Sequence, residues 1–204
     1  MTEIVVATSN DHKLQELRKI LPQSFNFSGM SDRGWSDEIP ETGSSFSANA
    51  LQKARYLSNK YHVNSLADDS GLEVEALNGK PGIFSARYAG PAADPIANLT
   101  KLLDDMQGVS NRKARFVTVL ALIFNGQEFL FEGFIEGHIT ETPSGQAGFG
   151  YDPVFIPKGR TQTFAEMSAS EKNQISHRAI AARKLCDFLT SSPYLSKGEG
   201  DFNL

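Results

Sequence analysis

The sequence predicts an α/β protein whose mixed, twisted β-sheet is flanked by helices and forms two lobes around a central cleft. The chain opens on a continuous apolar, β-branched run over residues 4–8, which is typical of a buried strand, and a segment with leucines at helical spacing follows it. Two further apolar runs flank Asn125-Gly126, the strongest short hairpin signal in the chain. Crossovers through helices favour parallel strands and a hairpin pairs its strands antiparallel, so both kinds of pairing are expected in one sheet.

In the first half of the chain, helical and strand-like patterns alternate. Leu14, Leu17 and Leu21 recur at helical spacing, and a serine that is a good N-cap precedes a second helical pattern. The predicted elements are, in order, a helix over residues 13–21, loop signals over 24–41, a helix that begins after Ser44 or Ser45, and a strand over 64–77. The second helix is expected to bury Phe46, Ala50, Ala54 and Leu57. A Ser-Gly pair at residues 70–71 predicts an interruption of the strand.

The second half of the chain continues with loops, helices and the predicted hairpin. Asp94-Pro95 predicts a helix start, and Ser168 with Glu171 resembles a capping box. The predicted elements are, in order, a loop over 77–90, a helix over 95–105, a strand pair over 114–139, a glycine-rich loop over 141–151 and a helix over 168–189. The last helix is expected to present Ile175, Ala179, Ala182, Cys186 and Leu189 as its apolar face. Residues 1–190 therefore form a single predicted domain, and residues 191–204 a flexible tail.

Composition and charge narrow the class of protein. A chain of 204 residues fits one domain, and its net charge of -4 gives no basic excess of the kind that nucleic-acid binders carry. Cys186 is the only cysteine, which excludes an intrachain disulfide and a cysteine-rich zinc site. The N-terminus lacks a signal-peptide pattern, and no apolar stretch reaches the length of about 18 residues expected for a membrane span. The expectation is a soluble cytoplasmic protein with neither a nucleic-acid nor a membrane partner.

The segment Thr8–Lys13, TSNDHK, lies between the first strand and the first helix. Such a loop directs backbone N–H groups and the positive end of the helix at a ligand, which suits phosphate, and Lys13 adds a charge. The glycine-rich pattern of a Walker A loop is absent. The alternative is an ordinary helix start that Asn10 or Asp11 caps, with Lys13 in solvent.

Glu41, Asp68 and Asp69 predict a magnesium site if their carboxylates converge. Mg²⁺ takes one or two carboxylates together with substrate phosphates and water, and it can activate a water nucleophile. The alternative is that Glu41 lies on the surface and that the two aspartates belong to a turn. If the strand continues through both aspartates, their side chains point to opposite faces of the sheet and cannot be equivalent.

Two further segments carry candidate binding residues. In GFGYDPVF the glycines allow close approach of a ligand, and Phe149 and Tyr151 offer flat faces for stacking a base. In SEKNQISHR the side chains of Lys172, His177 and Arg178 bring cations near a helix start, and the guanidinium suits a carbonyl or phosphate oxygen. The alternatives are aromatic side chains that fill the core and a solvated helix face.

Taken in order, these segments resemble the inosine triphosphate pyrophosphatase (Ham1-like) family of noncanonical purine nucleoside triphosphate pyrophosphatases. TSNDHKLQE matches a T-x-N-x-x-K-x-x-E opening, and LADDSGLEV, PGIFSARYAG, GFGYDPVF and SEKNQISHR follow at the expected places. The similarity spans roughly residues 4–190. Ser9 departs from the glycine that bacterial relatives usually have, and it adds a Cβ and a hydroxyl beside the phosphate loop.

The resemblance implies an active site in a cleft between two lobes, hydrolysis of ITP, dITP and XTP to the monophosphate and pyrophosphate, dependence on Mg²⁺, and a homodimer. It also implies a role for each acid, because Asp69 would accept the proton of the attacking water and would hold the metal together with Glu41. The residues that the resemblance implies for substrate binding are Thr8, Ser9, Asn10, Asp11, His12, Lys13, Ser70, Phe149, Gly150, Tyr151, Asp152, Lys172, His177 and Arg178.

Two other functions remain open from the residues alone. A general Mg²⁺ phosphohydrolase would release orthophosphate, and a regulatory nucleotide-binding module would bind without turnover. Selection of the base has a physical argument: a donor such as Arg178 favours the carbonyl at purine position 6, and against the amino group of adenine it is left unpaired, which is a costly mismatch. Exclusion of GTP would require a pocket that is tight around purine position 2, for which the loop over residues 149–152 is the candidate wall.

Overall fold

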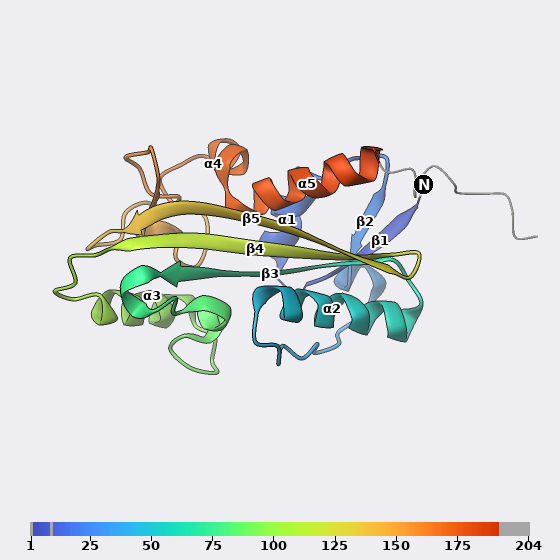
Figure 1. The fold of residues 1–204 in the computed structure, drawn as a ribbon, viewed down its shortest axis with the longest axis horizontal. Helices are drawn as coiled ribbons and strands as arrows, with labels where there is room; N and C mark the ends of the chain where they lie inside the picture. The colour runs from blue at the N-terminus through green and yellow to red at the C-terminus, as the bar shows by residue number, and fades with distance from the viewer. Residues whose placement is uncertain (1, 9, 192–204) are drawn as a thin grey trace, which may run out of the picture.

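The described part of the chain forms one six-stranded sheet with helices packed against it (Figure 1). The computed structural model describes residues 2–8 and 10–191, so Ser9 of the predicted phosphate loop and residues 192–204 of the predicted tail lie outside the described residues. The elements are, in chain order, β1 (Glu3–Ala7), α1 (Asp11–Arg18), β2 (Asn26–Gly29), α2 (Phe46–Tyr61), β3 (Ser65–Val74), α3 (Pro95–Asp105), β4 (Lys113–Phe124), β5 (Gln127–Ile139), β6 (Phe155–Pro157), α4 (Ala169–Ile175) and α5 (His177–Ser191). Short 3₁₀ turns occupy Ser31–Arg33, Glu75–Leu77, Gly82–Arg87 and Asp152–Val154.

The sheet is mixed, which confirms the predicted fold class. Its strand order is β2-β1-β3-β4-β5-β6, and β1 pairs parallel with both of its neighbours. The pairs from β3 to β6 are antiparallel. In Figure 1 the long strands β4 and β5 span the molecule, with β1, β2 and α2 gathered toward one end and α3 and α4 toward the other.

The hairpin between β4 and β5 forms where the sequence predicts it. Asn125 and Gly126 are its two turn residues, and both have positive φ values, 49° and 77°. This is the backbone that a tight turn between twisted strands requires, and it is why Asn-Gly is favoured there. The register continues directly from Phe124, which pairs with Gln127.

The predicted helix starts are confirmed at the level of individual hydrogen bonds. Ser45 caps α2, since its Oγ accepts from the backbone N–H of Ala48 at 3.1 Å. Asp94 caps α3, and Ser168 forms a complete capping box with Glu171 at α4. The predicted stripe of α2 is buried against the sheet at Phe46, Ala50, Ala54 and Leu57.

The predicted interruption of the third strand is wrong. β3 runs unbroken through Ser70 and Gly71, which pair with Thr118 and Val117 of β4. Gly71 is required for a close approach and not for a turn, because a Cβ there would lie 2.3 Å from the carbonyl oxygen of Gly82. The segment that follows β3 therefore folds back onto the strand at this glycine.

Two other predictions need correction. The loop signals over residues 24–41 conceal β2, a four-residue edge strand beside β1 that is too short for a clear pattern. The helix predicted over 168–189 is two helices, because Ser176 has an extended backbone with φ -65° and ψ 155°. The Oγ of Ser176 accepts from the N–H of Ala179 at 3.2 Å, so the serine that ends α4 also caps α5.

The core lies on both faces of the sheet. One cluster joins β1, β3 and β4 to α1 and α5, a second packs α2 against the opposite face, and a third fills the end that α3 and β6 cover. In the part of the chain that the structure describes, every helix is too short or too polar to cross a bilayer.

Candidate active site

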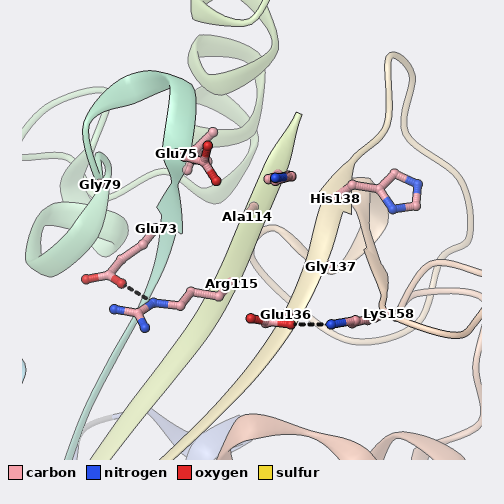
Figure 2. A pocket seen from close by; sticks show the side chains of 11 residues that line it. Glu73, Glu75, Gly79, Ala114, Arg115, Glu136, Gly137, His138 and Lys158 are labelled. Carbon is pink, nitrogen blue, oxygen red and sulfur yellow. Dashed lines mark hydrogen bonds and ion pairs between the residues drawn. The ribbon is translucent and has the colours of Figure 1, made fainter. Parts of the chain in front are cut away.

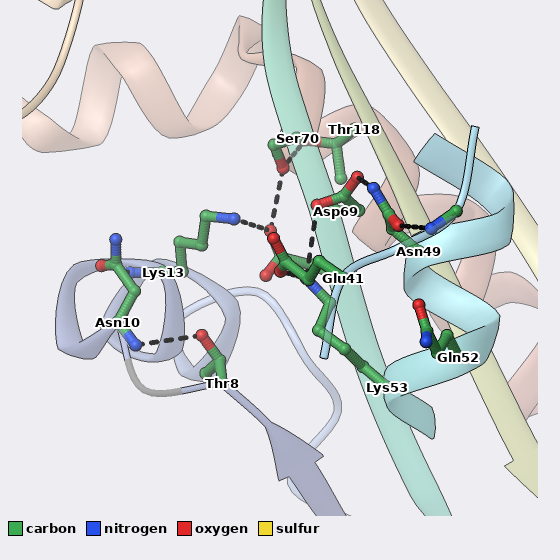
Figure 3. Close-up of polar contacts among 12 residues, drawn as sticks. Thr8, Asn10, Lys13, Glu41, Asn49, Gln52, Lys53, Asp69, Ser70 and Thr118 are labelled. Carbon is green, nitrogen blue, oxygen red and sulfur yellow. Dashed lines mark hydrogen bonds and ion pairs between the residues drawn. The ribbon is translucent and has the colours of Figure 1, made fainter. Parts of the chain in front are cut away.

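Asp68 and Asp69 are adjacent on β3 and contact different sides of the sheet. Asp68 meets Lys13 of α1 and Arg178 of α5. Asp69 meets Asn49 and Lys53, which belong to α2 (Figure 3). Because the strand is continuous, successive side chains alternate between its faces, and the two acids have separate surroundings.

The Asp68 carboxylate is a buried anion surrounded by cations. Its Oδ2 lies 3.1 Å from Lys13 Nζ and 3.5 Å from Arg178 Nη2, and it accepts from Ser70 Oγ at 2.8 Å. Its Oδ1 is buried and has no hydrogen-bond partner among the described residues. Burial alone would raise the pKa of Asp68, but Lys13 and Arg178 outweigh it and hold the pKa below the ordinary value. Asp68 is therefore ionised and forms ion pairs with both cations.

At the Asp69 carboxylate, the effect of burial on the pKa is larger than the effect of the neighbouring cations. Its Oδ2 accepts from Asn49 Nδ2 at 3.2 Å, and its Oδ1 lies 3.3 Å from Lys53 Nζ. Burial raises the pKa of Asp69 above its usual range, although Lys53 and Lys13 act against this shift. Asp69 is consequently a stronger base than an exposed aspartate, and α2 fixes both of its oxygens.

Glu41 joins Asp69 through a shared cation. It lies on the segment before α2, and its carboxylate accepts from Lys53 Nζ, the same ammonium that Asp69 contacts. Burial would raise the pKa of Glu41, but Lys53 and neighbouring cations bring it below the ordinary value. Two carboxylates from separate segments thus converge on one positive charge, which fits the hard oxygen ligands of Mg²⁺. No cluster of three or more His, Cys, Asp or Glu at metal-binding geometry occurs among the described residues.

The predicted phosphate loop is an N-capped helix start beside these acids. Asn10 caps α1, since its Oδ1 accepts from the N–H of Lys13 at 3.2 Å, and Thr8 Oγ1 accepts from the N–H of Asn10 at 3.1 Å. Asp11 is exposed, and the exposed His12 stacks on Phe149 with ring centroids 5.4 Å apart. The capping alternative is correct for Asn10, but Lys13 points to Asp68 and not into solvent.

The loop over residues 148–152 places its two aromatic rings differently. Phe149 lies beneath two cations, 4.8 Å from Lys172 Nζ and 5.7 Å from Arg178 Cζ. Tyr151 is buried in the third core cluster and donates its hydroxyl to the carbonyl of Ser85 at 2.8 Å. Gly150, between them, has φ 62°. Phe149 therefore faces the candidate site, whereas Tyr151 adopts the core-filling alternative.

Asp152 and Lys172 form a buried ion pair at this loop. Asp152 Oδ2 lies 2.7 Å from Lys172 Nζ and accepts from the N–H of Phe149 at 2.8 Å. Lys172 also lies 2.9 Å from Glu16 of α1, and Glu16 in turn accepts from Arg178. Burial raises the pKa of Asp152, and Lys172 opposes the shift. The alternative of a solvated helix face is therefore wrong for Lys172 and Arg178, because both side chains are buried and ion-paired.

His177 is the first residue of α5 and is also buried. Its ring stacks on Phe116 with centroids 4.7 Å apart and an interplanar angle of 9°, and its Nδ1 has no hydrogen-bond partner among the described residues. Burial, reinforced by Arg178, Lys172 and Lys13, lowers the pKa of His177 well below its ordinary value. The imidazole is therefore neutral at physiological pH.

Sequence reasoning missed four residues of this cluster. They are Glu16, Asn49, Lys53 and Thr118, whose hydroxyl lies 2.8 Å from that of Ser70. Glu16 ends the T-x-N-x-x-K-x-x-E pattern, so that motif already contained the signal. Asn49 and Lys53 interrupt the apolar stripe of α2 at helical spacing, and polar residues at buried stripe positions are the sign that could have revealed them.

Comparisons with known proteins identify the family of the chain. A Ham1 family model matches residues 4–188. A dITP/XTP pyrophosphatase of Porphyromonas gingivalis is 49% identical over 93% of this chain and 98% of its own, and one of Flavobacterium psychrophilum is 45% identical over 91% and 98%. The solved structure of a HAM1 protein from Coxiella burnetii superposes with a TM-score of 0.87 at 39% identity, covering 94% of this chain and 100% of that one. The chain is a member of the Ham1 family.

Proposed function

We propose that this protein hydrolyses noncanonical purine nucleoside triphosphates, namely dITP, XTP and ITP, to the nucleoside monophosphate and pyrophosphate. We place this activity in the cytoplasm, where it would remove these compounds from the nucleotide pool. Three cations from different elements, Lys13, Lys53 and Arg178, converge on the adjacent acids of β3, and this observation carries the proposal. The names of relatives at 45% and 49% identity support the same reaction.

Charge neutralisation explains how an acidic protein accommodates a polyanion. Lys13, at the N-terminus of α1, combines its ammonium with the backbone N–H groups of the first helical turn, which favour phosphate. Lys172 and Arg178 lie beside Phe149, each paired with buried carboxylates, and a purine would take the place of His12 on this ring. Donors at this end favour a carbonyl at purine position 6 over the amino group of adenine.

We assign the role of general base to Asp69. Asn49 and Lys53 hold its oxygens in a fixed direction, and its raised pKa increases its affinity for the proton of an attacking water. Glu41 and Asp69 would hold the divalent metal ion that the family generally needs, here Mg²⁺. When bound, such an ion supplies charge stabilisation to the phosphates and lowers the pKa of a coordinated water.

Product analysis with a panel of nucleotides tests the function. With Mg²⁺, purified protein should release pyrophosphate from dITP, XTP and ITP at rates at least about a hundredfold above those for ATP, because the unpaired donor on adenine costs several kcal/mol. Chelation of the metal should abolish the reaction. Orthophosphate as the first product would identify a general phosphohydrolase, and binding without any product would identify a regulatory module. Cleavage of GTP as fast as ITP would refute selection at purine position 2.

We also propose that the protein is a homodimer that pairs through an open face of β5. Alternate side chains of this strand are exposed on the side of the sheet that α2 covers elsewhere, namely Glu128, Leu130, Glu132, Phe134, Glu136 and His138. Beside them lies a hollow of about 650 Å³ bordered by the ion pairs Arg115–Glu73 and Lys158–Glu136 (Figure 2). Apolar residues among charges of both signs make this face complementary to a second copy of itself.

Sedimentation of a variant tests the dimer. Phe134→Glu, at a residue that is 47% exposed, should halve the molecular mass in solution because it adds like charge at the centre of the face. Ile96→Glu is the matched control, since Ile96 is an exposed apolar residue of α3. A monomeric wild type, or equal dissociation by both variants, would show that this face does not pair.

A further inference from the structure

Glu41 lies on an extended segment that belongs to no helix or strand. We call residues 35–43 the strap. Its odd-numbered side chains are half-buried and its even-numbered ones are exposed, as in a strand with one face covered. The inward set is Trp35, Asp37, Ile39, Glu41 and Gly43. Since Glu41 follows the same alternation, a shift of the strap by one residue would turn it out toward solvent.

The upstream end of the strap is attached to the last turns of α2. Trp35 stacks on Tyr61 with centroids 3.6 Å apart and an interplanar angle of 5°. Asp37 accepts from the hydroxyl of Tyr56 at 3.1 Å, and it also accepts from Lys60 Nζ and from the hydroxyl of Tyr61. One carboxylate thus has three donors from a single helix, and these hydrogen bonds lower the pKa of Asp37 below its ordinary value.

The downstream end is attached to the first turns of the same helix. The N–H of Thr42 donates to Gln52 Oε1 at 2.9 Å, and Gln52 Nε2 donates to Thr42 Oγ1 at 3.0 Å. The N–H of Gly43 donates to Asn49 Oδ1 at 2.8 Å, and the other end of that amide contacts Asp69. Glu41 immediately precedes this attachment and meets Lys53, also on α2 (Figure 3).

The two attachments fix the strap at both ends of one helix. Asp37 is held by Tyr56, Lys60 and Tyr61, and Gly43 is held by Asn49. Only six residues separate the attachments, and such a segment reaches at most about 20 Å. Release of the strap at Asp37 would therefore be felt four residues later, at Glu41.

We propose that Asp37 is a positioning residue, which holds the strap in the register that points the Glu41 carboxylate at Lys53 and Asp69. Asp37 does not touch the candidate substrate or metal residues and acts through the strap alone. The inference rests on the proposed function, because Glu41 matters there as a metal-binding carboxylate.

Asp37→Asn tests the proposal, with Trp35, the only tryptophan of the chain, as a direct probe of the strap. The tryptophan emission should shift to longer wavelength as the stack opens, and the Mg²⁺ concentration for half-maximal hydrolysis of dITP should rise about tenfold. The KM for the nucleotide should change by less than about twofold, because the strap does not contact the phosphate loop. Tyr61→Phe, which keeps the stack, should give a smaller shift in both quantities.

Glu128→Gln is the matched control, since the Glu128 carboxylate accepts from Arg55 on the same helix and does not touch the strap. Unchanged emission in Asp37→Asn, or a metal requirement equal to that of the control, overturns the proposal. If the wild type hydrolyses no triphosphate, the proposed function is wrong, but the role of Asp37 can still be tested. Cleavage by a glutamate-specific protease then shows whether Asp37 holds the strap in place. Faster cleavage after Glu38 and Glu41 in Asp37→Asn than in the control supports the proposal, and equal cleavage overturns it.

Discussion

Replacing Asp69 with asparagine is expected to lower the turnover number about a thousandfold while the protein still folds and binds nucleotide. Asparagine keeps the shape of the side chain but cannot accept the proton of the attacking water. Burial disfavours the ionised form of Asp69, and Lys53 retains Glu41 as a partner, so the free energy of unfolding should stay near that of wild type. Steady-state hydrolysis of dITP, nucleotide titration and urea unfolding measure the three quantities.

Replacing Asp68 with asparagine should have a different main effect. Lys13 would remain in the interior without its anion, and Arg178 would keep only Glu16. Removal of one partner from a buried ion pair costs about 3 to 5 kcal/mol of unfolding free energy. The pKa of Asp68 is lowered in the folded state, so its stabilisation is complete above about pH 4 and is lost as the pH falls toward the folded pKa. A measurement at pH 7 therefore reports it in full.

Asp104→Asn provides the control for both variants, because Asp104 is an exposed aspartate on α3. The expected pattern is a loss of rate for Asp69, a loss of stability for Asp68 and neither for Asp104. Equal losses of turnover in Asp68→Asn and Asp69→Asn, with the stability of wild type in both, would show that Asp68 takes part in the chemistry directly.

Of the substitutions that add one methyl group to β5, Gly133→Ala is expected to lower the free energy of unfolding most. A Cβ at Gly133 would lie 2.2 Å from the carbonyl oxygen of His177 and 2.5 Å from the backbone nitrogen of Ala181. Both are backbone atoms of α5, which cannot rotate away, so the helix would have to leave the sheet. We expect a loss of about 3 kcal/mol of unfolding free energy, together with lower turnover, because α5 carries His177 and Arg178.

Gly79→Ala is the control for Gly133→Ala, because it strains the backbone without crowding any neighbouring atom. Gly79 has φ 82° and no atom within 4 Å of an added Cβ, so alanine there strains only the backbone and should cost about 1 kcal/mol. Denaturant unfolding followed by Trp35 emission compares the two variants. An equal effect in both would mean that α5 can shift without loss of packing.

Features set by neighbouring residues could be predicted from the sequence, and features set by distant contacts could not. Ser45, Asp94 and Asn125-Gly126 act through hydrogen bonds and φ values within a few residues, and each lies where the pattern indicates. Gly71 resembles a turn residue locally, but the chain requires it because Gly82 packs against the strand. The helical spacing of apolar residues in the last predicted helix likewise gives no sign of the break at Ser176.

In the candidate site, too, local features could be predicted from the sequence and features set by distant contacts could not. The adjacency of Asp68 and Asp69 and the period of a strand predict that they serve different surroundings, and the structure agrees. The identity of those surroundings depends on packing, since Lys53 reaches Asp69 only because α2 lies on that face of the sheet. From the sequence alone, a lysine in an apolar helical stripe can lie at the edge of the stripe in solvent or form a buried ion pair, and only the packing distinguishes the two.

The bond between Glu16 and Arg178 joins residues 162 positions apart in the chain. A ribosome releases α1 long before it has synthesised α4 and α5, so a nascent chain carries Glu16 before the two cations that pair with it, Lys172 and Arg178. Burial of an unpaired anion is unfavourable, which discourages closure of this part of the interior before those cations are present. The ion pairs of Glu16 can therefore form only once the last two helices dock.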